Sequence, residues 1–261
     1  MCIRDSLYIP IGPKTIWRTR KSYAPIINVF SGGLPIIPET QPKTVERLIV
    51  PEPGFGHQSR MRGTDKYKNT MRRRVAETIA PEGSERLYVS RSELNDTRGS
   101  VFGEKLIEAC MAANGYEIFH PQQHSAAEQL ARYRAARYLV SLDGSAIHFA
   151  AYALQPGAKV AIIKRRKSDI PDNMARQLGR FADAEVDLIE VIKTMWVKAG
   201  TRHIDHRSFG ELDLVQLSKI LFERGFLSKP DQLRNMRQDE IREYLDARHT
   251  GANELAPIDP A

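Results

Sequence analysis

The chain has 261 residues, a formal net charge of +7 and a hydrophobic content of 41%. This length suits one large or two small domains, and the apolar content is enough for a buried core. No apolar run approaches the roughly 20 residues that cross a bilayer, and the first residues lack the pattern of a signal peptide. We therefore expect no transmembrane segment. From the cysteine content of the chain we expect a cytoplasmic protein, and we allow it peripheral association with the inner face of the membrane.

The positive charge predicts an anionic partner, such as a phosphate, a sugar nucleotide, a membrane surface or a nucleic acid. Net charge does not choose among them. The basic residues cluster at 60–74 and at 164–167, and a solvated surface is the simpler interpretation of each cluster. The two cysteines, Cys2 and Cys110, give no disulfide framework and favour a reducing compartment.

Residues 1–6, MCIRDS, do not fit the strand-like pattern that follows, and we expect a non-native leader on an N-terminally incomplete chain. Up to residue 58 the apolar pieces are short and are cut by Pro, Gly and Ser, which favours short strands and loops. Residues 66–79 have the length and spacing of an amphipathic helix. Residues 81–83, Pro-Glu-Gly, then break the chain, and we place a domain boundary there. The short apolar pieces are 7–11, 26–30, 34–37 and 45–50.

From residue 86 to 164, short apolar runs alternate with amphipathic segments, which is typical of a parallel sheet with helices on its faces. Ser125, with Glu128 three residues later, is a capping box that opens one of these helices. Gly115 suits the left-handed position after the expected helix 101–114. The expected strands are 86–90, 116–119, 138–142 and 159–163, and the expected helices are 101–114, 126–136 and 146–154. Beyond them we expect a helix at 171–182, a strand at 186–192, and helices at 212–224 and 231–248.

Polar residues gather where these strands end. They are Ser90 and Arg91, then His120, then residues 143–145, then Lys164. Open parallel sheets bind ligands outside the carboxyl ends of their strands. This part of the chain therefore resembles a ligand-binding half-domain in its organisation.

Arg91 and Arg98 lie at the two ends of the loop after the first of these strands. Two guanidinium groups there can hold a diphosphate through paired hydrogen bonds, although surface arginines are common. Asp143, Gly144 and Ser145 form a strand-to-helix turn whose backbone N–H groups can face an anion. The turn matches neither the dinucleotide fingerprint nor the P-loop, so an ordinary capped turn is an equal interpretation.

Other chemistries find less support in the sequence. His120, His124 and His148 lack the cysteine or carboxylate partners of a zinc site. There is no G-x-S-x-G elbow and no supported Cys–His pair for acyl transfer. Neither a nucleic-acid recognition module nor an alternation of basic and aromatic residues is present. We expect no metal and no nucleic-acid partner.

Three segments taken together resemble glycosyltransferase family 61. They are YVSRSELNDTRG, NGYEIFHP and SAAEQLARYRAARYLVSLDGSAIHFAAYALQPGAKVAII. They contain, in the family's order, a strand ending in Ser-Arg, a second arginine, a strand ending near Pro, a Glu-Gln pair, a hydrophobic strand with a Gly-Ser turn, and a Pro-Gly pair. ERLIVPEPGFG upstream matches as well, so the resemblance covers residues 45–192.

The resemblance implies an α/β fold of GT-B type, in which a Rossmann-like parallel sheet forms the donor half and the N-terminal α/β half is incomplete. It implies an inverting enzyme that transfers a sugar from a nucleotide-sugar donor, a UDP-sugar, to a glycan acceptor in surface or capsular polysaccharide synthesis. It implies no cofactor and no obligatory metal. The residues that match donor-binding positions are Arg91, Arg98, Glu128, Gln129, Gly144 and Ser145.

Two positions depart from the family pattern, which usually has His in place of Asp143 and Asn in place of Phe149. An aspartate beside a diphosphate would repel it unless the side chain turned away or paired with an arginine. Asp143 is also the one candidate that we name for the catalytic base, which is otherwise unidentified.

The resulting domain plan has four parts. Residues 1–82 are a partial acceptor-side region, 83–195 the nucleotide-sugar-binding domain, 196–250 a helical extension, and 251–261 a disordered tail. The alternative function is a non-catalytic sugar- or nucleotide-binding module, such as a degenerate transferase.

Overall fold

A five-stranded parallel sheet forms the centre of the computed structural model, which describes residues 7–10, 24–39, 41–42, 44–49, 55, 63–94, 98–247 and 255–259. The strand order is β4-β3-β5-β6-β7. β5 and β6 at the centre of the sheet are mostly aliphatic, as expected where helices cover both faces of a sheet. The predictions for 138–142 and 159–163 are confirmed to the residue. The bounds are β3 Arg86–Val89, β4 Glu117–Phe119, β5 Tyr138–Leu142, β6 Lys159–Ile163 and β7 Glu185–Ile189.

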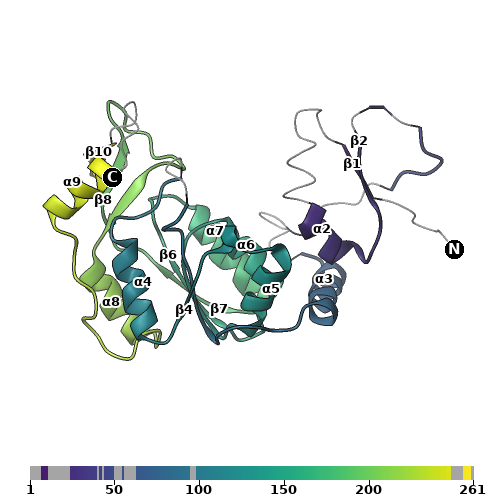
Figure 1. Cartoon of the computed structure of the whole chain (residues 1–261), viewed down its shortest axis with the longest axis horizontal. Helices are drawn as coiled ribbons and strands as arrows, with labels where there is room; N and C mark the ends of the chain where they lie inside the picture. Colours follow the sequence, from purple (N-terminus) through teal and green to yellow (C-terminus); the bar gives the residue numbers. More distant parts are fainter. Residues whose placement is uncertain are drawn as a thin grey trace.

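Helices cover the two faces of this sheet and give a three-layer arrangement (Figure 1). On one face, α5, α6, α7 and the π-helical turn η5 enclose a first core, which contains Leu139 and Val160. On the other face, α4 and α8 enclose a second core, which contains Val140 and Ala161. The alternation of neighbouring strand residues between the two cores follows from the period of two of a strand. The bounds are α4 Glu104–Ala113, α5 Ala126–Ala135, α6 Ser145–Ala150, α7 Ile170–Gln177, η5 Leu178–Ala182 and α8 Leu214–Glu223.

Local signals at the helix ends are confirmed. Ser125 caps α5 by accepting from the backbone N–H of Glu128, while the Glu128 carboxylate accepts from the backbone N–H of Ser125. Gly115 has a φ of 77° after α4, a conformation that glycine adopts without a steric penalty. These two features fix where α4 ends and where α5 begins.

The N-terminal part contains β1 Leu7–Pro10, α2 Ala24–Ser31, β2 Ile36–Glu39 and α3 Asp65–Thr78. β1 and β2 pair in parallel, on the side of the molecule where α3 lies (Figure 1). The expectation of a strand at 26–30 is wrong, because this run is helical and its Val29 and Phe30 pack against the first core. A short apolar run does not by itself separate a buried strand from a buried helix. The predicted strand at 45–50 is also not formed over the described residues 45–49, and the suspected leader lies outside the described residues.

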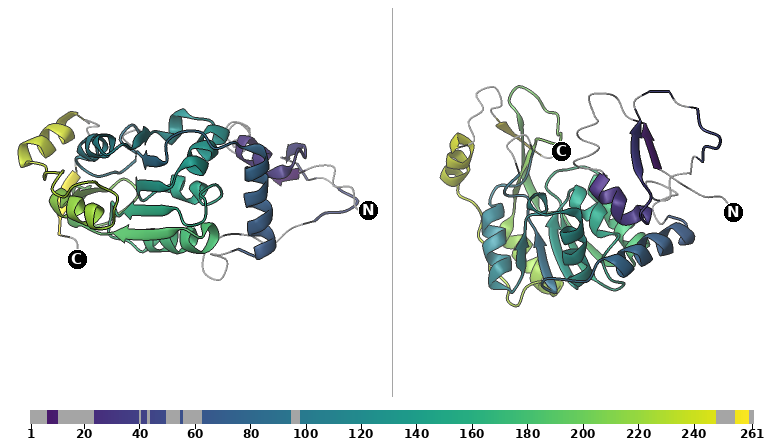
Figure 2. Two further views of the ribbon diagram at one scale, coloured as in Figure 1. Left: turned by 90° about the horizontal axis from the view of Figure 1, so that it is seen from below. Right: turned by 45° about the vertical axis from the view of Figure 1, so that its right-hand side comes forward.

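The C-terminal part adds a three-stranded antiparallel sheet in the order β10-β8-β9 (Figure 2). The expected helical extension therefore also contains strand, and the expected disordered tail is wrong for 255–258, which pair with β8. Phe102 packs among Trp196, Phe209 and Tyr244 and holds this sheet and α9 together. Such pairing between distant segments leaves little trace in the local sequence. The bounds are β8 Ile192–Lys198, β9 Phe209–Leu212, α9 Gln238–Ala247 and β10 Leu255–Ile258.

The five-stranded sheet confirms a parallel α/β domain where the sequence predicted one. The second, acceptor-side half of a GT-B fold, and the division of the chain at residues 82, 195 and 250, stay predictions. Several described contacts cross the first boundary: Val75 of α3 is buried in the first core, and Lys68 and Arg72 of the same helix contact residues 183, 151 and 154.

Candidate functional site

The strand order locates a ligand site at the carboxyl ends of β3 and β5. After β3 the chain crosses outward to β4, and it then returns past β3 to β5. This reversal is the topological switch point at which open α/β sheets bind ligands. The residues that follow the two strands are Ser90 and Arg91 after β3, and Asp143 and Gly144 after β5. Two of the predicted donor-binding positions, Arg91 and Gly144, are thus adjacent.

Arg91 lies directly against Gly144. A Cβ atom on Gly144 would lie 2.6 Å from Nη1 of Arg91. The glycine backbone is extended, with a φ of 175°, so the glycine is needed for space and not for its conformation. Nη2 of Arg91 donates to the carbonyl oxygen of Gly99 at 3.2 Å, while Nε is buried and has no hydrogen-bond partner among the described residues.

Asp143 is paired with an arginine. This is one of the two arrangements, pairing or turning away, that would let an aspartate lie beside a diphosphate. Its side chain is 1% exposed, and its Oδ1 accepts from the backbone N–H of Arg165 at 2.7 Å. Nε of Arg165 lies 3.3 Å from Oδ2, within ion-pair distance although not aligned as a hydrogen bond. A general base must reach the proton it removes. A buried and paired Asp143 is better described as a counter-charge than as that base.

Arg165 and Arg166, which the sequence analysis did not select, join Arg91 and Arg98 at this edge. Burial lowers the pKa of Arg165 to about 10; Asp143 opposes this shift, and Arg91 and Arg166 add to it. Burial also lowers the pKa of Arg91, where Glu104 and Asp143 act against the shift and Arg98 and Arg166 with it. Arg91 is therefore close enough to Arg98, Arg165 and Arg166 for mutual repulsion, and Arg165 is close enough to Arg166.

The basic run 164–167 is only in part the solvated cluster that we expected. Lys164 and Arg165 are buried, and Arg166 is half-buried. Nζ of Lys164 lies 2.9 Å from carboxylate oxygens of both Asp172 and Glu190. The signal that could have identified Arg165 and Arg166 was their place directly after β6, the same position that drew attention to Arg91.

Glu104 ties together the two ends of the loop that carries Arg91 and Arg98. Its Oε1 accepts from the backbone N–H of Arg91 at 2.7 Å, and its Oε2 accepts from the hydroxyl of Ser100 at 2.6 Å. Burial raises the pKa of Glu104, and these two hydrogen bonds oppose the shift. A single buried carboxylate thus closes the loop and supplies negative charge beneath Arg91.

The remaining predicted donor residues lie at the same edge but have local roles. The Glu128 carboxylate belongs to the capping box of α5. Nε2 of Gln129 donates to the carbonyl oxygens of Pro121 at 2.8 Å and His124 at 3.1 Å. Ser145 is exposed at the start of α6. Contact of these three residues with a donor stays a prediction.

Phe149, the second departure from the family pattern, faces the protein interior. Its ring meets that of Tyr133 at a centroid distance of 6.3 Å, and it packs against the first core. An asparagine at this place would lose that packing. The phenylalanine at position 149 thus contributes to the packing of the first core.

Two cations of the N-terminal basic cluster act inside the fold. Nζ of Lys68 lies 2.5 Å from Oδ2 of Asp183, and Arg72 donates to the carbonyl oxygens of Ala151 and Leu154 after α6. These contacts attach α3 to the body of the molecule. For these two residues the interpretation as a solvated surface is wrong.

The histidines considered as metal ligands are spread over separate contacts. Nε2 of His120 lies 3.5 Å from Oε1 of Glu93, and the ring of His124 stacks on Phe119. Within the described part of the chain, no three His, Cys, Asp or Glu side chains come together as a metal-binding group. Metal independence stays a prediction.

None of the helices formed by the described residues is long and apolar enough to cross a membrane.

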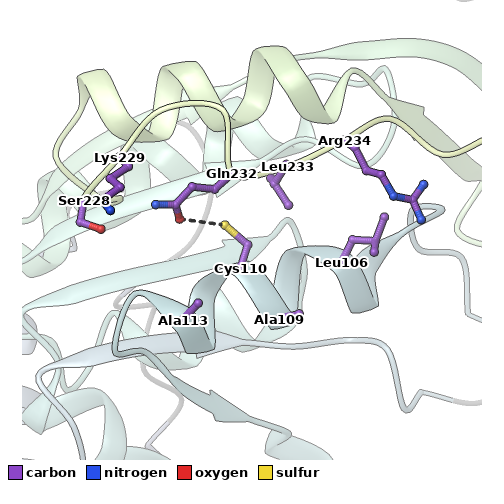
Figure 3. A pocket seen from close by; sticks show the side chains of 9 residues that line it. All are labelled: Leu106, Ala109, Cys110, Ala113, Ser228, Lys229, Gln232, Leu233 and Arg234. Atoms are coloured by element: carbon purple, nitrogen blue, oxygen red, sulfur yellow. Dashed lines mark hydrogen bonds between the residues drawn. The ribbon is translucent and has the colours of Figure 1, made fainter.

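A hollow of about 630 Å³ lies elsewhere, between α4 and residues 228–234 (Figure 3). Figure 3 shows Cys110 of α4 facing Gln232, to whose Oε1 its thiol donates at 3.6 Å. Asn114 donates to the same oxygen, and burial raises the pKa of Cys110, which disfavours the thiolate. None of the predicted site residues lines this hollow. We therefore place the candidate site at the arginines.

A family model described as Glycosyltransferase 61 matches residues 17–161, more than half of the chain. The matched span includes Arg91, Arg98 and the Gly144 turn, and it ends within β6, before Arg165 and Arg166. No curated protein matches the chain.

Proposed function

The chain belongs to glycosyltransferase family 61, and from this premise we propose that it transfers a sugar, with inversion, from a nucleotide-sugar donor to a glycan acceptor. The observation that carries the proposal is the group of arginines beside Gly144 at the switch point of the sheet. Family membership suggests the reaction, and the arginines suggest where the donor binds.

The chemistry of the arginine group suits a departing nucleoside diphosphate. In an inverting transfer the acceptor oxygen forms a bond to the anomeric carbon while the bond from that carbon to the diphosphate oxygen breaks. The electron pair of the broken bond stays with the diphosphate, and the acceptor proton passes to a base. Preorganised guanidinium groups stabilise the charge that develops on the leaving oxygen. The guanidinium of Arg91 is such a group, because it donates to the carbonyl oxygen of Gly99 while the backbone N–H of Arg91 donates to Glu104.

The finer parts of the proposal follow from the same charges. Guanidinium groups can neutralise a diphosphate without a divalent cation, which supports transfer without an obligatory metal or other cofactor. We propose a UDP-sugar as donor and a surface or capsular glycan as acceptor. The reaction would then take place in the cytoplasm, with peripheral association at the inner face of the membrane.

The test is a thermal-shift panel of UDP-, GDP- and CMP-sugars in the presence of EDTA. We expect a UDP-sugar to raise the melting temperature, because a ligand that binds the folded state stabilises it. Arg91→Ala should abolish the shift. Arg137→Ala is the matched control, because Arg137 precedes β5 at the opposite edge of the sheet, pairs with Glu85 and is 73% exposed.

Two results would contradict the proposal. One is a panel in which no nucleotide sugar stabilises the protein, and the other is a shift that Arg91→Ala leaves intact. Asp143, the named candidate for the base, is buried and paired, which keeps the non-catalytic binding module as the second candidate. Release of UDP in the presence of bacterial glycan acceptors supports the transferase, whereas binding without release supports the module.

A further inference from the structure

We propose that Arg166 binds the second phosphate of the donor, so that the site selects nucleoside diphosphates over nucleoside monophosphates. This inference rests on the proposed function and extends it to a residue beyond the span that the family model matches. The inference starts from the contrast between Arg166 and the two basic residues that precede it, Lys164 and Arg165.

Four consecutive basic residues follow β6, and carboxylates neutralise the first two. Lys164 pairs with Asp172 and Glu190, and Arg165 pairs with Asp143. Arg166 is half-buried, and its Nε atom is buried with no hydrogen-bond partner among the described residues. A buried donor without an acceptor costs free energy. An oxygen atom of a bound ligand would remove that cost.

The order of the strands puts Arg166 across the Gly144 turn from Arg91. β5 lies between β3 and β6 in the sheet, so the turn after β5 lies between the loops that carry the two arginines. The loops also meet at one atom, because Arg91 and Arg165 both donate to the carbonyl oxygen of Gly99, at 3.2 Å and 3.3 Å. Arg91 and Arg166 each have a buried Nε to which no described residue offers an acceptor. One phosphate on each side of the turn matches this arrangement.

The charge at the site supports a ligand with two phosphates. Arg91 interacts electrostatically with Arg98, Arg165 and Arg166, and both Arg91 and Arg165 interact with the carboxylates of Asp143 and Glu104. Among the described residues of this group, four guanidinium groups against two carboxylates leave a surplus of two positive charges. The diphosphate that joins a nucleoside to a sugar carries two negative charges, whereas a nucleoside monophosphate joined to a sugar carries one.

The experiment compares UDP with UMP by isothermal titration calorimetry on the wild type, Arg166→Ala, Arg166→Gln, Arg91→Ala and the control Arg137→Ala. Charge-assisted hydrogen bonds of about 1.5–3 kcal/mol correspond to a loss of roughly 10- to 150-fold in affinity. We expect this loss for UDP in both Arg166 variants, with UMP affinity changed less than about threefold. Arg137→Ala should leave both affinities unchanged. Melting temperatures show which variants are folded, and Arg166→Gln keeps the test valid if the alanine variant is not.

The outcomes separate this inference from the proposed function. If the wild type binds neither nucleotide, the proposed function fails. If it binds UDP and Arg91→Ala abolishes binding, but the Arg166 variants keep the preference for UDP over UMP, the proposed function stands and this inference is overturned. An equal loss for both nucleotides would also overturn it, because a general loss of charge would then explain the effect.

Discussion

Gly144 determines where the Arg91 guanidinium can lie. Its backbone is extended, a conformation open to any residue, but a Cβ there would lie 2.6 Å from Nη1 of Arg91. The obstructing atom belongs to the flexible end of a side chain, which can move. The cost of a side chain at this position would therefore fall on the placement of Arg91 more than on the fold.

This argument predicts that Gly144→Ala separates stability from ligand binding. We expect the free energy of unfolding to change by less than about 0.5 kcal/mol, as for a typical surface substitution. The affinity for UDP should fall by roughly tenfold or more, because a charge-assisted hydrogen bond is lost. Urea denaturation and calorimetry with UDP measure the two quantities. Unchanged UDP affinity in a folded variant would show that Gly144 does not position Arg91 for binding.

At the scale of single residues, the sequence predicted some members of the site and not others. Arg91 and Gly144 could be predicted, because each directly follows a strand and each matches the family pattern. Arg166 occupies a similar position, but sequence does not show that carboxylates neutralise Lys164 and Arg165, whereas the structure gives Arg166 no ion pair with a described carboxylate. The burial of Asp143 against Arg165 depends on a contact between residues 22 positions apart. Such pairings are set by the sheet and not by local sequence.

At the scale of elements, β9 packs closely on the loops that carry the arginines. A Cβ on Gly99 would lie 2.1 Å from the carbonyl oxygen of Ser208, and one on Gly210 would lie 2.4 Å from that of Arg165. Backbone hydrogen bonds accompany this approach, from Gly99 to His206 and from Gly210 to Ser100. The C-terminal antiparallel sheet thus supports the site from its edge.

Gly99→Ala should therefore destabilise the protein where Gly144→Ala does not. The neighbouring atoms are backbone and cannot rotate away. We therefore expect the free energy of unfolding to fall by about 1–3 kcal/mol, as for overpacked sites. Gly179→Ala in η5 is the matched control, because its Cβ would meet nothing nearer than 3.8 Å. Urea denaturation of the two variants makes the comparison. Equal stability of the two would refute the proposed close packing of β9 on this loop.

The elements that could be predicted are those with complete local signals. β5 and β6 are apolar runs between clear breaks, and α5 opens with a capping box. α2 and β10 were not predicted, because their assignment depends on distant partners. α2 packs on the first core, and β10 pairs with β8.

At the scale of the whole molecule, the candidate site draws on distant parts of the chain. Loops after β3, β5 and β6 supply its charged groups, and β9 supports two of these loops. The β1–α2–β2 unit is a parallel pair with its crossover helix. Two strands alone make a marginal sheet. An acceptor-side domain built around that unit stays a prediction, whereas the five-stranded sheet and its helices form a layered domain.

The most direct test of the central claim is a crystal structure of the protein with UDP. We predict that the diphosphate lies beside Gly144, within hydrogen-bond distance of Arg91 on one side and of Arg166 on the other. UDP bound in the hollow between α4 and residues 228–234, or a diphosphate that contacts neither arginine, would contradict the account.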